Sequence, residues 1–215
     1  MLSGKKLIIF DMDGTLFNTL KDLNNSVNFA LEKFGYDLVT IAHTRRAIGN
    51  GVPTLIARSI PDGLEDPHYQ ECLSIFKDHY REHYFENTFP YEGILETLTK
   101  LKSRGYLLAC VTNKFDEGAN KLINYFLPNI FDKVHGECDE YRKKPYPDLV
   151  ELTLQELKVS KDEAVYVGDT EVDYQTAVNS GVDPIMVSYG YRTKEQILEI
   201  TKNAPIIDAP SELLD

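Results

Sequence analysis

The chain has 215 residues, enough for one large domain or for a core domain with a smaller companion. Acidic residues outnumber basic ones by 34 to 23, and the formal net charge of −11 argues against a nucleic-acid or anionic-membrane binder, which needs a basic face. A hydrophobic content of 42% excludes a disordered chain. Three widely spaced cysteines indicate neither a disulfide framework nor a cysteine-based zinc site. With no secretory signal and no apolar run of membrane-spanning length, we expect a cytoplasmic protein.

Short apolar runs recur along the chain, bounded by glycine, aspartate and asparagine, and fit strands buried on both faces. These runs are 7–10, 107–111, 164–167 and 184–187, with a weaker one at 131–135. Segments with apolar residues at helical spacing lie between them, around 94–101, 119–126 and 150–157, and 193–196 has the form of a capping box. This alternation predicts an α/β fold with a doubly wound, Rossmann-like parallel sheet.

One interval, from about Leu16 to Phe89, lacks a convincing strand and has helical spacing instead. Apolar residues step by three and four over 20–34 and again over 69–80. We therefore predict a small α-helical cap domain at 17–86, inserted into an α/β core made of 1–16 and 87–215.

Two aspartates, Asp11 and Asp13, leave the first predicted strand at its carboxyl end, where doubly wound sheets have their ligand crevice. Two neighbouring carboxylates are costly unless a cation or a shared proton offsets their charges. This arrangement suits Mg²⁺ held by oxygen ligands. A plain Asp-x-Asp-Gly turn at the end of a strand is the alternative that this motif alone leaves open.

The string Asp11-Met12-Asp13-Gly14-Thr15-Leu16 resembles the first motif of the haloacid dehalogenase-like phosphohydrolases. The resemblance implies that Asp11 is the nucleophile, which forms an aspartyl-phosphate, and that Asp13 is the general acid and base. Relatives with a helical insertion often have aspartate at the position of Asn18, a departure that lies outside the chemistry.

Two further motifs supply groups for binding a phosphoryl group. Val111-Thr112-Asn113-Lys114 ends the second apolar run, where a hydroxyl and backbone N–H groups can hold phosphate oxygens. It resembles the second family motif, in which Thr112 and the amide of Asn113 bind the phosphoryl group. The K-P-x-P string beginning at Lys144 resembles the third motif. By this resemblance, Lys144 neutralises the nucleophile and the transferring group.

The fourth motif is Gly168-Asp169-Thr170-Glu171-Val172-Asp173, after another apolar run. It resembles the family pattern G-D-x-x-x-D, which implies that Asp169 completes the Mg²⁺ shell and that Asp173 acts nearby, directly or through water. The implied metal ligands are therefore Asp11, Asp13, Asp169 and Asp173. The alternative is an aspartate N-cap followed by surface acids.

The four motifs occur in the family's order across about 160 residues, and the resemblance covers essentially the whole chain. It implies a Mg²⁺-dependent phosphatase that acts on a small phosphomonoester. The segments 48–53, 112–114 and 189–191 resemble phosphoglycolate phosphatases, so 2-phosphoglycolate is the expected substrate. The same cap type also occurs in sugar-phosphate phosphatases and phosphomutases, nucleotidases and pyrophosphatases, which stay open as alternatives.

Two distant alternatives use other features of the chain. His79, Glu82 and His83 fit the H-x-x-E-H string of inverted zinc proteases, although no third ligand is evident. A phosphate-binding module without turnover is the second, but the intact Asp11 and Lys144 argue against it.

The predicted cap also bears on partners. A lid over the crevice would exclude water and large substrates, and Arg45, Arg46 and Asn50 are candidates for contacting the leaving group of the substrate. We expect a small phosphorylated metabolite as the partner, no nucleic acid and no membrane, and a monomer or homodimer.

Overall fold

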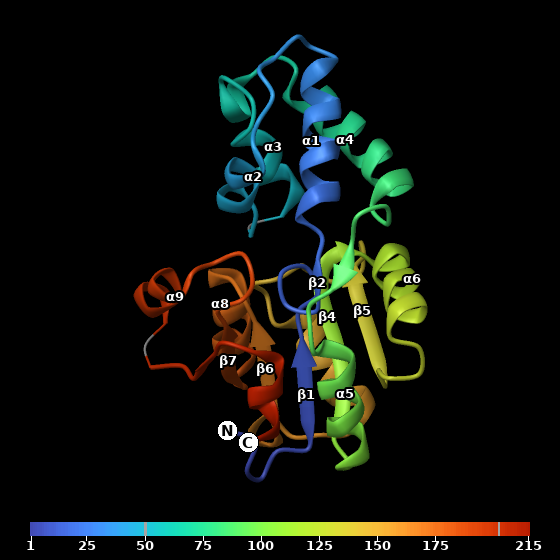
Figure 1. The fold of residues 1–215 in the computed structure, drawn as a ribbon, viewed down its shortest axis with the longest axis vertical. Coiled ribbons are helices and arrows are strands. Elements are labelled where there is room, and N and C mark those ends of the chain that lie inside the picture. The colour runs from blue at the N-terminus through green and yellow to red at the C-terminus, as the bar shows by residue number, and fades with distance from the viewer. Residues whose placement is uncertain (50, 202) are drawn as a thin grey trace. The chain divides into compact units, whose positions relative to one another are not determined.

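A six-stranded parallel sheet forms the centre of the larger of two compact units, which comprises residues 1–18 and 90–215. The computed structural model describes residues 1–49, 51–201 and 203–215. The apolar run at the N-terminus becomes the central strand, between β4 and β6 (Figure 1). In spatial order the strands are β5 (Lys133–Glu137), β4 (Leu107–Phe115), β1 (Leu7–Phe10), β6 (Ala164–Gly168), β7 (Asp183–Val187) and β8 (Ile206–Ile207).

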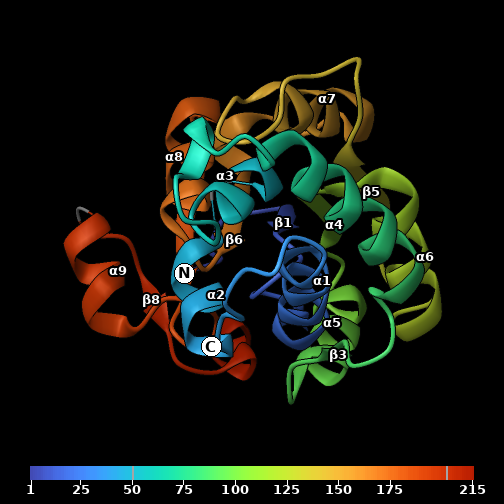
Figure 2. The ribbon, with the colours of Figure 1, turned by 90° about the horizontal axis from the view of Figure 1, so that it is seen from above.

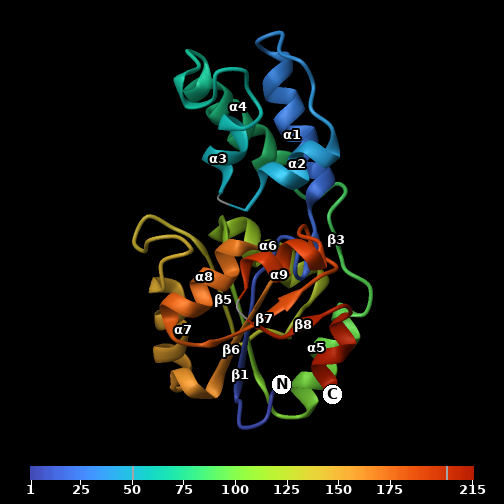
Figure 3. The ribbon, with the colours of Figure 1, turned by 90° about the vertical axis from the view of Figure 1, so that its left-hand side faces the viewer.

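Helices cover both faces of this sheet, as the alternating pattern predicts. Helices α7 and α8 lie on one face and α5 on the other, which Figure 3 shows edge-on and Figure 2 from above. The helices of this unit are α5 (Ile94–Ser103), α6 (Asp116–Phe126), α7 (Asp148–Leu157), α8 (Glu171–Ser180) and α9 (Lys194–Ile200), with short 3₁₀ turns at Lys161–Glu163 and Pro210–Leu214. The doubly wound α/β fold predicted from the sequence is confirmed. The capping box at Thr193 is also present, because its side chain accepts from the N–H of Gln196.

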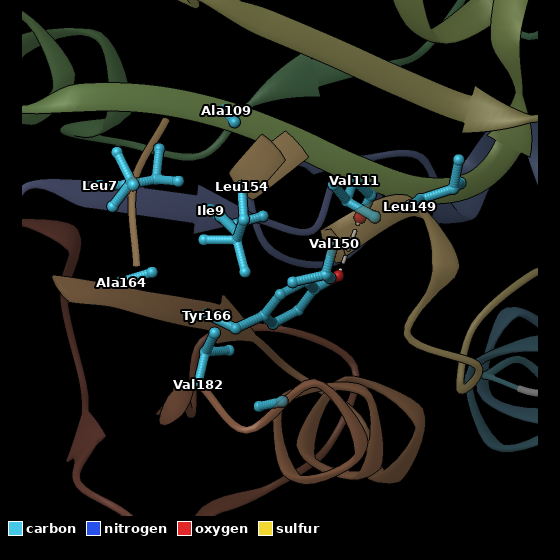
Figure 4. Packing of buried hydrophobic residues seen from close by; sticks show 12 residues of the cluster. Leu7, Ile9, Ala109, Val111, Leu149, Val150, Leu154, Ala164, Tyr166 and Val182 are labelled. Carbon is cyan, nitrogen blue, oxygen red and sulfur yellow. Dashed lines mark hydrogen bonds between the residues drawn. The ribbon is translucent and has the colours of Figure 1, made fainter. Parts of the chain in front are cut away.

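The core on the α7 and α8 face is built from apolar side chains of the central strands (Figure 4). Leu7 and Ile9 of β1 have no exposed surface, and Leu154 of α7 packs in the same cluster. Tyr166 of β6 is also buried there, and its hydroxyl donates to the backbone oxygen of Val111 at 2.8 Å. This packing holds three neighbouring strands in fixed register, so their carboxyl ends form a rigid platform.

The second unit, residues 19–89, is helical. Its main packing pair is α1 with α4, whose buried side chains recur at the spacing seen in the sequence. Its elements are α1 (Leu20–Glu32), α2 (Ile41–Ala47), α3 (Val52–Ala57), a 3₁₀ turn at Gly63–Glu65 and α4 (Tyr69–His83). The chain leaves the core through the short strand β2 (Phe17–Asn18) and returns through β3 (Phe89–Pro90), which pair as a separate two-stranded sheet. None of the helices in the described ranges combines the length and the apolar character that crossing a membrane requires.

A buried carboxylate ties together the two ends of the helical unit. Asp22, in the first turn of α1, is 1% exposed. Its oxygens accept from the backbone N–H and the side-chain amide of Asn87, at 2.7 to 3.0 Å, and from the Thr88 hydroxyl at 2.9 Å. Hydrogen bonds to a charged group are stronger than neutral ones, and a buried donor left without an acceptor is costly.

We therefore expect Asp22→Ala to lower the free energy of unfolding by about 2–4 kcal/mol. Urea unfolding followed by circular dichroism measures this loss. Asp37→Ala is the matched control, because Asp37 is an exposed aspartate of the same unit, and it should change the midpoint little. Equal midpoints for both variants would show that the hydrogen bonds of Asp22 contribute nothing net.

Candidate active site

The acidic residues of the site lie at the carboxyl ends of two neighbouring strands. Asp11 directly follows β1 and Asp169 directly follows β6, and these strands are paired in register, with Phe10 opposite Val167. The chain order reverses at this point, because β4 and β5 lie on one side of β1 whereas β6, β7 and β8 lie on the other. Ligands of doubly wound sheets bind at such a reversal.

A tight turn after β1 brings its backbone against Asp169. The N–H groups of residues 15–17 all point to the carbonyl oxygen of Met12, and Gly14 has φ +94°. A Cβ on Gly14 would lie 2.3 Å from the Asp169 carboxylate, and a Cβ on Gly190 would lie 2.6 Å from it. Both glycines are therefore needed for the close approach of two backbone segments to this carboxylate.

Lys144 connects the acidic residues. It lies in the loop before α7 and is 6% exposed. Its ammonium donates to Asp11 Oδ1 at 2.6 Å, to Asp173 Oδ1 at 2.7 Å and to the Tyr166 hydroxyl at 3.0 Å. Because Tyr166 donates in turn to the carbonyl of Val111 (Figure 4), the ammonium is held at a fixed place between two carboxylates.

The backbone of Lys144 is held as firmly as its side chain. The Asn113 side chain accepts from the Lys144 N–H at 2.8 Å and donates to the Lys144 carbonyl at 3.1 Å. The family resemblance assigned the backbone amide of Asn113 to phosphoryl binding, which stays a prediction, and the structure adds that the Asn113 side chain positions the lysine. Thr112, the other residue assigned to phosphoryl binding, is 1% exposed near the end of β4, and its hydroxyl accepts from the N–H of Lys114 at 3.2 Å.

Asp173 and Asp169 are fixed by bonds from the start of α8 and from the loop after β7. Asp173 Oδ2 accepts from the backbone N–H groups of Asp169 and Thr170 and from the Thr170 hydroxyl, which completes a capping box. Asp169 Oδ2 accepts from the Tyr191 N–H at 2.7 Å, and the Thr15 hydroxyl lies 3.4 Å from its other oxygen. Both carboxylates are therefore oriented before any ligand arrives.

The electrostatics of these groups show an excess of negative charge. Burial, with the charge of Asp173 adding to it and Lys144 opposing it, raises the pKa of Asp11 to about 7. Burial and the charge of Asp173 raise the pKa of Asp169 well above its usual range. Burial opposes the charge on Lys144, but Asp11 and Asp173 outweigh it and hold the pKa of the lysine well above its usual range. Full ionisation of all three carboxylates beside one ammonium would leave two negative charges uncompensated, and the raised pKa values of Asp11 and Asp169 express the cost of that excess.

Asp11, Asp169 and Asp173 fit a divalent cation. Each offers a carboxylate oxygen, and these three oxygens all lie within 4.8 Å of one another. Hard oxygen ligands with two charges in excess match the preference of Mg²⁺. Asp13 is not a member of this group. Its Oδ1 lies 3.5 Å from the ammonium of Lys114 and has no hydrogen-bond partner in the described part of the chain.

The zinc-protease string gathers no metal site within 1–49, 51–201 and 203–215, where the acidic group above is the one set of candidate ligands. His79 Nδ1 lies 3.0 Å from the Ser26 hydroxyl, and its ring stacks on Phe29. His83 bonds to Glu86 at 2.6 Å. The ring of His79 therefore belongs to the packing of the helical unit, and that of His83 stacks on it while staying partly exposed.

Three residues of the helical unit are expected from the sequence to contact the leaving group of the substrate. Arg45 and Arg46 are exposed in the last turn of α2, and Asn50 lies outside the described residues.

Sequence reasoning missed Tyr166 and Lys114 as members of the site. Tyr166 stands in the apolar run of β6, and the signal was available, because a buried tyrosine hydroxyl needs a hydrogen-bond partner. Lys114 follows Thr112 by two residues, and only the irregular end of β4 decides where its side chain points.

The sequence profile of the family described as haloacid dehalogenase-like hydrolase matches residues 8–187. The chain belongs to the haloacid dehalogenase-like hydrolases. Among the relatives of this hydrolase, a phosphoglycolate phosphatase of Aquifex aeolicus (strain VF5) is 32% identical over 202 residues, which are 93% of each chain. A phosphoglycolate phosphatase of Aliivibrio fischeri (strain ATCC 700601 / ES114) is 30% identical over 92% of this chain and 90% of its own.

Solved structures give the same result for this hydrolase. A crystal structure from Lactobacillus delbrueckii subsp. bulgaricus ATCC BAA-365 has a TM-score of 0.91 at 32% identity and covers 97% of this chain and 96% of its own. A predicted phosphoglycolate phosphatase from Haemophilus somnus 129PT has a TM-score of 0.88 at 27% identity, with 100% and 98% covered. The hydrolase is a phosphoric monoester hydrolase, and the family and enzyme class predicted from the sequence are confirmed.

Proposed function

We propose that this hydrolase is a Mg²⁺-dependent phosphatase of small phosphomonoesters, with 2-phosphoglycolate as its substrate. The observation that carries the proposal is the group of three buried carboxylates with a single lysine among them, at the reversal point of the sheet. The named activity of the relatives supports the choice of substrate.

Asp11 is the proposed nucleophile, because it is buried at the end of the central strand and hydrogen-bonded to Lys144. One of its carboxylate oxygens attacks phosphorus, and the bond from phosphorus to the ester oxygen breaks. Asp13 donates its proton to the leaving oxygen, so glycolate departs with a neutral hydroxyl group at that oxygen and keeps its carboxylate. The product of this step is an aspartyl-phosphate.

The second step restores the enzyme. Asp13 takes a proton from water, whose oxygen attacks phosphorus and releases inorganic phosphate and the Asp11 carboxylate. The proton taken from water replaces the one that Asp13 gave to the leaving group, so each turnover consumes one water and no other reactant. Lys144 and the Thr112 hydroxyl stabilise the charge on the transferring group.

The proposed Mg²⁺ site is formed by the carboxylates of Asp11, Asp169 and Asp173. Asp13, which the resemblance also implies as a ligand, lies outside this group of three, and its part in the metal shell stays a prediction. A bound Mg²⁺ would neutralise the excess negative charge and polarise the phosphoryl oxygens. The Tyr191 N–H holds the carboxylate of Asp169 in a fixed orientation for this site, and the Thr170 hydroxyl does the same for Asp173.

A substrate panel tests the proposal through the release of inorganic phosphate with Mg²⁺ present. We expect the highest kcat/KM with 2-phosphoglycolate, lower values with glucose 6-phosphate, adenosine monophosphate and pyrophosphate, and negligible hydrolysis of a phosphopeptide. Higher kcat/KM for a sugar phosphate would overturn the substrate and keep the mechanism. Efficient phosphopeptide hydrolysis would contradict the restriction to small substrates, which was also expected from the inserted segment 17–86.

A further inference from the structure

A second buried lysine lies in the acidic site, on the side of Asp13. The Lys114 side chain is 1% exposed, and its ammonium lies 3.5 Å from Asp13 Oδ1. Burying an ammonium is costly unless an opposite charge is near. This distance exceeds that of a charge-assisted hydrogen bond, so the attraction between Lys114 and Asp13 is electrostatic and involves no hydrogen bond at this oxygen.

The irregular end of β4 directs this lysine inward. Over 111–115, β4 advances four residues, whereas its partner β5 advances two over 135–137. Extra residues in one strand form a bulge, which re-aims side chains and is common beside active sites. A Cβ on Gly136 would lie 2.6 Å from the carbonyl oxygen of Lys114, so the glycine lets β5 pass close to the bulged backbone. Lys114 is thus placed by a specific feature of both strands.

The two lysines, Lys144 and Lys114, contact residues with different roles in the proposed reaction. Lys144 contacts Asp11 and Asp173, on the side of the nucleophile and the metal ligands. Lys114 stands beside Asp13, which donates its proton to the leaving oxygen in the proposed mechanism. A positive charge at Lys114 is therefore close to the leaving group rather than to the attacking oxygen.

We propose that Lys114 binds a carboxylate carried by the leaving group, so the enzyme selects phosphate esters of 2-hydroxy acids over esters of neutral alcohols. The inference rests on the proposed phosphatase function and deepens it. In such esters a single carbon separates the ester oxygen from the carboxylate. The Lys114 ammonium, which lies beside the proton donor Asp13, is therefore close to the ester oxygen and to the carboxylate at once. An ammonium with a carboxylate forms a charge-assisted hydrogen bond that a neutral hydroxyl does not replace.

The test compares 2-phosphoglycolate with 2-hydroxyethyl phosphate, in which a CH₂OH group replaces the carboxylate. Lys114→Met keeps the length and the apolar stem of the side chain and removes its charge. We expect this variant to lose about a hundredfold in kcat/KM for 2-phosphoglycolate, mostly through KM, because the carboxylate is bound equally in the ground and transition states. For 2-hydroxyethyl phosphate the loss should stay within about threefold.

Two variants serve as controls. Lys161→Met, which removes an exposed lysine paired with Glu151, should leave both substrates unchanged. Lys144→Met should reduce the turnover of both substrates alike, because its partners are Asp11 and Asp173.

Equal losses on both substrates in Lys114→Met would overturn the inference and leave the phosphatase function standing. A wild-type enzyme that hydrolyses both esters equally well would do the same. Hydrolysis of neither ester by the wild type would overturn the proposed function and the inference together.

Inhibition of the wild-type enzyme gives a second test, which does not depend on the folding of Lys114→Met. We expect glycolate to inhibit the hydrolysis of 2-hydroxyethyl phosphate competitively, and ethylene glycol at the same concentration to have no effect. Equal inhibition by the two compounds, or inhibition by neither, would contradict a carboxylate site at Lys114.

Discussion

Replacing Asp11 with asparagine should leave a folded protein with about a thousandth or less of the wild-type turnover. The amide has the shape of the carboxylate but does not attack phosphorus, and its oxygen can still accept from the ammonium of Lys144. Burial and the charge of Asp173 already oppose the charge on Asp11, as its raised pKa of about 7 shows. Loss of that charge therefore relieves the fold of a buried negative charge.

Phosphate release with 2-phosphoglycolate or p-nitrophenyl phosphate measures the loss, and thermal unfolding shows that the variant is folded. Asp139→Asn is the matched control, because Asp139 is an exposed aspartate outside the site, and it should retain full activity. Retention of more than a tenth of wild-type activity by Asp11→Asn would rule out Asp11 as the nucleophile.

Replacing Asp169 with asparagine should raise the Mg²⁺ concentration for half-maximal activity by about tenfold or more, since one of three charged ligands becomes neutral. The amide oxygen can still accept from the Tyr191 N–H, so the loop stays in place. In the wild type, chelation should abolish activity and added Mg²⁺ should restore it.

Mg²⁺ titrations of activity and of the melting temperature give two readouts. A tenfold weaker Mg²⁺ affinity reduces the stabilisation by saturating Mg²⁺ by about 1.4 kcal/mol. Asp162→Asn, at an exposed position outside the site, is the control. If Asp169→Asn keeps the Mg²⁺ dependence of the wild type, Asp169 does not belong to the metal shell.

The site residues that could be predicted from the sequence pattern share one property: each lies at or near the carboxyl end of a strand. Asp11, Thr112 and Asp169 follow or end apolar runs, and parallel strands carry such ends to the same edge of the sheet. Lys144 does not lie at the end of a strand, so its position in the sequence alone does not predict that it belongs to the site. Only the resemblance to the third family motif identified it. The weaker run at 131–135 became a strand two residues later, at Lys133–Glu137, because strand pairing with β4 decides its limits rather than hydrophobicity.

Contacts between segments that are distant in sequence were beyond prediction. The hydrogen bond from the Lys144 N–H to the Asn113 side chain joins the loop before α7 to strand β4, 31 residues earlier in the chain. The bidentate pair of Arg192 with Glu171 joins the loop after β7 to the first turn of α8. Such pairs depend on register and on loop conformation, which local composition does not specify.

The hydrogen bonds of Asp22 also explain how the core tolerates so long an insertion directly after its first strand. A flexible loop of about 70 residues between β2 and β3 would impose a closure entropy of about 4 kcal/mol on the core. Because Asp22 joins the start of the helical unit to Asn87 and Thr88 at its end, the helical unit closes this loop through its own folding. For the pairing of β1 with β4, the inserted segment then acts like a short turn, because the entropy of closing it is met by the folding of the helical unit itself.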